Sequence, residues 1–68
     1  MLVVTVKRIG YVVDKTTAEA TSRWAVLPTV AGRPLGQGFA WTGENLTGLL
    51  AEMRTSLGHA VARLVVRE

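Results

Sequence analysis

One stretch of the chain has apolar residues that follow the period of an α-helix, and this stretch limits what the remainder can form. Within residues 41–58, five long apolar side chains fall at positions i, i+3, i+4, i+7 and i+11: Leu46, Leu49, Leu50, Met53 and Leu57. This spacing places them along one stripe of a helix, which must be buried against another element. The sequence therefore predicts one amphipathic helix packed on structure formed by the rest of the chain.

The ends of this stretch carry residues that are typical of helix termini. Thr42 is the predicted N-cap, and Trp41 before it takes the outer position of a hydrophobic staple. Glu44 and Arg54 place charges that suit the helix dipole at the two ends. Gly58 supplies the flexible backbone that commonly follows a helix C-cap.

Three further stretches predict β-strands. Residues 2–13 are rich in β-branched side chains, and Gly10 interrupts them where we expect a β-bulge. Residues 59–67 alternate in character and predict a final strand. Residues 39–41 predict a short strand that leads into the helix.

Residues 16–27 fit two different structures. Thr16 and Glu19 have the spacing of a helical capping box, whereas the alternation along the stretch has the period of a strand. We favour a strand that pairs with the first one as a long hairpin and ends at Pro28. Residues 28–38 hold both prolines and are predicted to form a loop.

The predicted order is β-β-(β)-α-β, which describes a single α+β domain of residues 1–68 with one helix packed on an antiparallel sheet. The chain has 68 residues and no cysteine, so no disulfide can stabilise it. A domain of this size buries only about 60% of the surface that its unfolded chain exposes. We therefore expect further stabilisation from a homodimer or from docking on a partner.

The chain is basic, with a formal net charge of +3, which suits an anionic partner. No apolar run approaches the roughly 20 residues of a membrane-spanning helix. Met1 is followed directly by strand-like residues and not by the basic segment of a signal peptide. We therefore expect a cytoplasmic protein with no membrane association.

The final predicted strand has an outer face that combines valine with arginine. The side chains sharing this face are Val61, Arg63, Val65 and Arg67. Interface centres favour this mixture, whereas a solvated sheet face is normally more polar. Together with Arg33 in the loop, these residues are predicted to bind a protein with an acidic or phosphate-bearing surface. The alternative is a half-wet sheet face with isolated valines.

Nucleic-acid binding is a second hypothesis. Phe39 and Trp41 could stack on bases beside the positive charge of Arg23, as in proteins that bind single strands. If Trp41 serves the helix terminus and Trp24 faces the inside of a strand, this stacking platform disappears.

The sequence offers no motif for catalysis, a cofactor or a metal. Gly32, Gly36 and Gly38 lack the lysine and hydroxyl residue that complete a phosphate-binding loop. His59 is the only histidine, and it follows the predicted helix end, where a cation is favoured. Without cysteine, a structural zinc site is close to excluded. We expect a non-enzymatic protein.

Pro28 and Gly32 are followed by Gly36, Gln37 and Gly38, then by Thr42 and the predicted helix. Over roughly Trp24 to Leu57, this pattern resembles the N-terminal domain of HicB-type antitoxins, and Pro28 and Gly32 match the turn of that family. The chain departs from the family at Ala31, where a second proline is preferred, and before Thr42, where no aspartate stands. The resemblance implies a β-β-β-α-β fold and a small inhibitor of another protein, since these antitoxins bind and block the HicA toxin. Such stand-alone chains are often encoded by phages or mobile elements.

Overall fold

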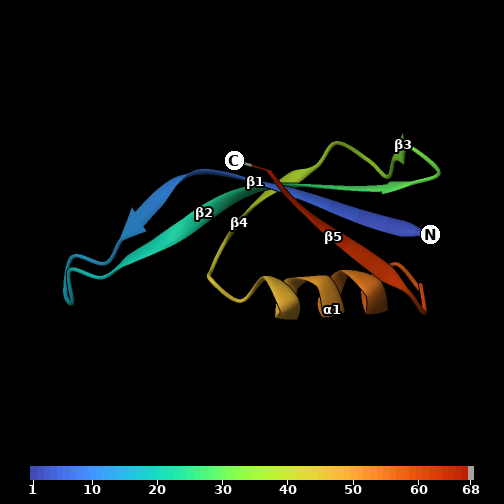
Figure 1. Ribbon diagram of the computed structural model, residues 1–68. Helices are drawn as coiled ribbons and strands as arrows, with labels where there is room; N and C mark the ends of the chain where they lie inside the picture. The colour runs from blue at the N-terminus through green and yellow to red at the C-terminus, as the bar shows by residue number, and fades with distance from the viewer. Residues whose placement is uncertain (68) are drawn as a thin grey trace.

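The computed structural model describes residues 1–67 and shows one helix lying against one face of a five-stranded sheet (Figure 1). The elements are β1 (Leu2–Val13), β2 (Ala20–Val30), β3 (Arg33–Pro34), β4 (Phe39–Thr42), α1 (Leu46–Ser56) and β5 (Ala62–Arg67). The predicted α+β class is therefore confirmed.

β1 is the central strand of the sheet, because β2 pairs with one of its edges and β5 with the other. β3 and β4 pair with the far edge of β2. The prediction of a purely antiparallel sheet is wrong at β5, which runs parallel to β1. β4 also runs in the direction of β1, so α1 connects two parallel strands. A helix is the usual crossover in such a connection.

The β1–β2 hairpin confirms two of the predictions. Its register shifts between Arg8 and Gly10, which leaves Ile9 as the extra residue of a β-bulge. Of residues 16–27, for which we favour a strand, residues 20–27 lie in β2, whereas residues 16–19 belong to the connection between the two strands of the hairpin. In that turn the Asp14 carboxylate accepts bonds from the backbone N–H groups of Thr16 and Thr17.

Pro28 does not end β2, which continues to Val30. Pro28 lies opposite Val4, and its carbonyl oxygen accepts a bond from the Leu35 N–H on the far edge of the strand. The N and O atoms of one strand residue point to the same side, so the missing N–H also faces that edge. On that edge, Pro28 lies between the part of β2 that pairs with β3 and the part that pairs with β4. No neighbouring strand therefore requires a hydrogen bond from its nitrogen. Residues 28–38 are accordingly only partly loop.

The helix begins later than predicted. Thr42 belongs to β4, and Asn45 is the N-cap, because its side-chain oxygen accepts the Gly48 N–H at 2.9 Å. Glu44 therefore precedes the helix and is not in its first turn.

The predicted end of the helix at Gly58 is confirmed. Gly58 has φ +71°, and it donates to the Thr55 carbonyl while the His59 N–H donates to that of Arg54. This pair of bonds is a Schellman motif. The last strand starts at Ala62, three residues later than predicted, because the chain must first leave this motif.

The core lies between α1 and the sheet. Its buried apolar side chains are Leu2, Val4, Val6, Trp24, Val26 and Leu49. The predicted helix stripe supplies Leu49 together with the half-buried Leu46, Leu50 and Met53, whereas Leu57 at the C-cap is exposed. Because Leu2, Val4 and Val6 in the first half of β1 are buried in this core, Val3, Thr5 and Lys7 face the other side of the sheet.

Candidate functional site

The face of the sheet opposite α1, which we call the open face, has no other element of the described chain packed on it (Figure 1). The register of β5, β1 and β2 arranges its side chains in three rows. These rows are Arg63–Val3–Thr29, Val65–Thr5–Leu27 and Arg67–Lys7–Ala25. The middle row is largely apolar, and rows with cations lie on both sides of it. Arg63 and Arg67 are four residues apart, so their Cα atoms lie about 13 Å from each other.

Positive charge dominates the open face. Four of the eight lysine and arginine residues occupy its outward positions: Lys7, Arg23, Arg63 and Arg67. Within residues 1–67, the carboxylates lie in the β1–β2 turn (Asp14, Glu19), before α1 (Glu44) and on α1 (Glu52). No outward sheet position in the three rows holds one. The open face therefore attracts anionic groups.

The structure brings three of the five predicted partner-binding residues together. Arg63, Val65 and Arg67 lie on the open face of β5. Val61 precedes the strand and is 61% exposed. Arg33 lies in β3 opposite Val30, whose side chain packs toward the core, so Arg33 is on the α1 side of the sheet and at its other edge.

Sequence reasoning missed Lys7 and Leu27 as members of the same surface. The alternation of β1 identifies Lys7 as outward-facing, but only the parallel pairing places it beside Arg67. Leu27 joins the middle row through its pairing with Thr5. Both contacts depend on strand pairing between residues that are distant in sequence.

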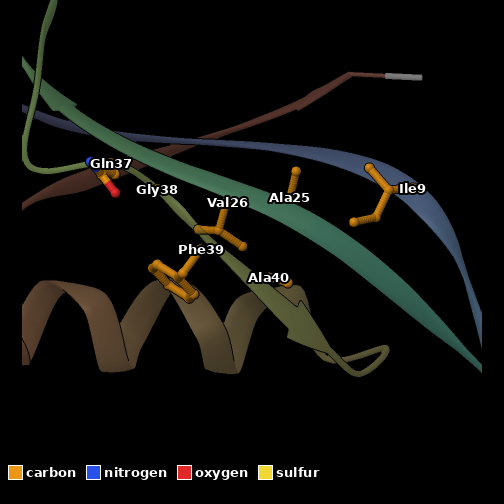
Figure 2. Close-up of a pocket in the computed structure, with 7 residues that line it drawn as sticks. All are labelled: Ile9, Ala25, Val26, Gln37, Gly38, Phe39 and Ala40. Atoms are coloured by element: carbon orange, nitrogen blue, oxygen red, sulfur yellow. The ribbon is translucent and has the colours of Figure 1, made fainter.

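The predicted nucleic-acid contacts divide between the two faces. Phe39 and Trp41 pair with Val26 and Trp24, whose side chains are buried toward α1. Figure 2 shows Phe39 directed toward the helix and Ala25 directed away from it. Arg23 occupies an outward position on the open face. The aromatic residues and the cations of the open face are therefore on opposite sides of the sheet.

A second polar cluster lies on the α1 side, where β2 meets the segment before the helix. The Glu44 carboxylate accepts the Ser22 backbone N–H at 2.6 Å, and the Trp24 indole donates to the Gly43 carbonyl at 2.9 Å. The Arg8 guanidinium lies over the Trp24 ring, 4.9 Å from its centroid. These contacts hold the segment before the helix against the sheet, and the guanidinium of the exposed Arg8 covers the Trp24 ring.

The same contacts lower the pKa of Glu44 below its ordinary value of 4.5. The largest cause is the bond from the Ser22 N–H, followed by the Ser22 hydroxyl and then by the positive charge of Arg8. All three favour the ionised carboxylate over the neutral acid.

Replacing Glu44 with glutamine is therefore expected to reduce stability at neutral pH and to have less effect in acid. Because the pKa is lower in the folded chain, ionised Glu44 stabilises the fold above pH 4.5, and this contribution is lost as the pH falls from there through the folded pKa. Urea unfolding at pH 7 and at steps below 4.5 measures the difference, with Glu52→Gln as the control. A Glu44→Gln effect that stays constant over this range would contradict the expectation.

A shallow hollow lies beside the β-bulge, between β2 and the segment leading into β4 (Figure 2). Its lining residues are Ile9, Ala25, Val26, Gln37, Gly38, Phe39 and Ala40. Gln37 is the only one with a polar side chain, and none is titratable. The hollow therefore has no group that could act as an acid, base or nucleophile.

Two further kinds of feature, a metal-binding cluster and a membrane-spanning helix, were sought within the described residues. Within residues 1–67, no three His, Asp or Glu side chains are grouped so that they could hold a metal ion. No helix in the same range has the length and apolar character needed to span a membrane.

Comparison with known proteins found no matching family model, no matching curated protein and no matching solved structure.

Proposed function

We propose that this chain is a small non-enzymatic interaction module that acts in the cytoplasm as a homodimer. Its open face binds the acidic surface of another protein and thereby inhibits or regulates that protein. The supporting observation is the arrangement of an apolar row, Val65–Thr5–Leu27, between rows that carry Arg63, Arg67 and Lys7. Apolar side chains would form the buried centre of the interface, and the arginines would make paired hydrogen bonds to carboxylates at its rim.

The charge of the open face argues against a second copy of the chain as its occupant. Two open faces in contact would bring together Lys7, Arg23, Arg63 and Arg67 from both copies, without any carboxylate from the three rows. Like charges in a contact cost several kcal/mol. An acidic protein surface avoids this cost, so the proposed dimer uses a different part of the molecule.

The separation of aromatic residues from the open face favours a protein partner over a single-stranded nucleic acid. Stacking on aromatic rings supplies about 1–3 kcal/mol per base in single-strand binding. Phe39 and Trp41 cannot supply this on the surface that carries Arg63 and Arg67, because they lie on the α1 side. The HicB resemblance points in the same direction, toward an inhibitor of another protein.

The test is an affinity capture with the tagged full chain from cells of its natural source, with and without nuclease treatment. The proposal expects a stoichiometric acidic protein that stays bound after nuclease treatment and is released by high salt. Recovery of nucleic acid alone would contradict it and would favour the nucleic-acid hypothesis.

A further inference from the structure

The β1–β2 hairpin extends past the helix as an arm, defined as residues 8–22 (Figure 1). The molecule is 41 Å long but only 19 and 18 Å in the other two dimensions. Four apolar side chains of the arm, Ile9, Tyr11, Val12 and Val13, are between 43% and 60% exposed. A two-stranded ribbon alone is marginally stable in water, and neighbouring exposed apolar side chains are typical of an interaction surface.

The two edges of the arm differ. The edge formed by β2 is closed at Ser22, whose carbonyl accepts the Gly43 N–H and whose own N–H donates to Glu44. The edge formed by β1 is paired with β5 only as far as Lys7. Beyond it, residues 8–13 have no strand beside them in the described chain. An open edge of this kind is a template for another strand.

The direction of the backbone groups along this edge follows from the hairpin. Ser22 uses its N–H and carbonyl on the side away from β1, so Tyr11 opposite it exchanges no ladder bonds with it. In an antiparallel pair such positions alternate. Tyr11 and Val13 therefore direct their backbone N–H and carbonyl groups to the open edge, whereas Val12 directs its own to β2.

The charges of the arm are complementary between its two ends. Asp14 and Glu19 lie at the tip, with Lys15 as the one cation there. Lys7, Arg8 and Arg67 lie at the base, where β5 ends beside β1. The base and the tip are separated by six residues of β1, or about 20 Å. Antiparallel pairing of two arms would place each acidic tip beside the basic base of the other copy.

We propose that two copies of this chain associate through antiparallel pairing of residues 8–13, which forms a four-stranded ribbon across a two-fold axis. This inference rests on the homodimer of the proposed function and adds its interface. In both copies, the pairing provides hydrogen-bond partners for the open backbone groups of Tyr11 and Val13. It also brings the exposed apolar side chains of the two arms side by side and places the acidic tip of each copy near the basic base of the other. It leaves Arg63 and the row Val65–Thr5–Leu27 of both copies accessible to a partner, whereas Lys7 and Arg67 lie beside the acidic tip of the other copy.

The experiment compares sedimentation equilibrium of the purified full chain with that of two variants at position 13. Val13→Pro removes an N–H from the open edge but leaves the β2 ladder intact. Val13→Thr keeps the N–H and a β-branched shape, so it serves as the control. We expect a dimer for the wild type and for Val13→Thr, and a dissociation constant for Val13→Pro that is raised roughly tenfold or more.

Circular dichroism of each protein checks that the fold is kept, and Tyr11→Pro, the other open-edge position, replaces Val13→Pro if that variant unfolds. A folded proline variant that dimerises as tightly as wild type would overturn the arm interface while leaving the homodimer intact. A wild-type monomer at high micromolar concentration would overturn both. Partner capture through the open face is measured separately, so its success or failure is not confused with either outcome.

Discussion

Replacing Trp24 with alanine is expected to unfold most of the protein at physiological temperature. Trp24 is only 4% exposed, and it joins the core, the Arg8 guanidinium and the Gly43 carbonyl. Truncating a buried tryptophan costs about 3–5 kcal/mol. A domain of this length has roughly 3–10 kcal/mol of total stability, from about 0.05–0.15 kcal/mol per residue. The loss is therefore comparable with the whole free energy of unfolding.

Thermal unfolding followed by circular dichroism measures this loss. Phe39→Ala is the control, since Phe39 is an aromatic residue on the same side of the sheet but is 43% exposed. It should melt much closer to the wild type. A Trp24→Ala protein with a wild-type melting curve would show that the core does not depend on this side chain.

The double substitution Arg63→Glu and Arg67→Glu is expected to abolish capture of the acidic partner while leaving the fold intact. Both side chains are exposed at the open face, and neither belongs to the core. Reversing two charges against an acidic surface replaces attraction by repulsion worth several kcal/mol. We expect affinity to fall by about 100-fold or more.

The matched control for this variant is Arg33→Glu with Arg54→Glu. It changes the net charge by the same amount, but Arg33 is on the α1 side of the sheet and Arg54 is in the last turn of α1. If capture depends on the open face, the control retains most of its affinity. Equal loss in both variants would mean that only overall charge matters, and undiminished capture by the first variant would remove the proposed surface.

Local sequence patterns predicted the elements whose residues determine their own structure. The helix followed from its apolar spacing, and its end followed from Gly58, because glycine readily adopts the positive φ that this position requires. The bulge followed from Gly10 within a strongly β-branched run. In these cases the physical cause lies within a few neighbouring residues.

The errors arose where a distant segment decides the local structure. Thr42 is a good N-cap by composition, but it pairs with Arg23 in β4, so the helix starts only after Asn45. Pro28 is tolerated within β2 because its missing N–H falls in the gap between two partner strands. Neither condition can be recognised without knowing the pairing of the sheet.

The candidate site likewise combines features that local sequence determines with features that depend on strand pairing. Arg63, Val65 and Arg67 could be assigned to one face from alternation alone. Lys7 lies on the same surface beside them only because β5 and β1 pair in a parallel register, and this register has no local signature in the sequence. Arg33, which is predicted to bind the partner from the loop, lies in β3 at the opposite edge of the sheet, and this position also depends on strand pairing.

The most direct measurement is nuclear magnetic resonance of the isotope-labelled chain as the captured partner is added. We expect the backbone amide signals to change most along the open face, at Thr5, Leu27 and Val65, and those of the exposed α1 residues Ala51, Glu52 and Thr55 to remain in place. Changes concentrated on α1, with none at Thr5 and Val65, would show that the open face is not the docking surface.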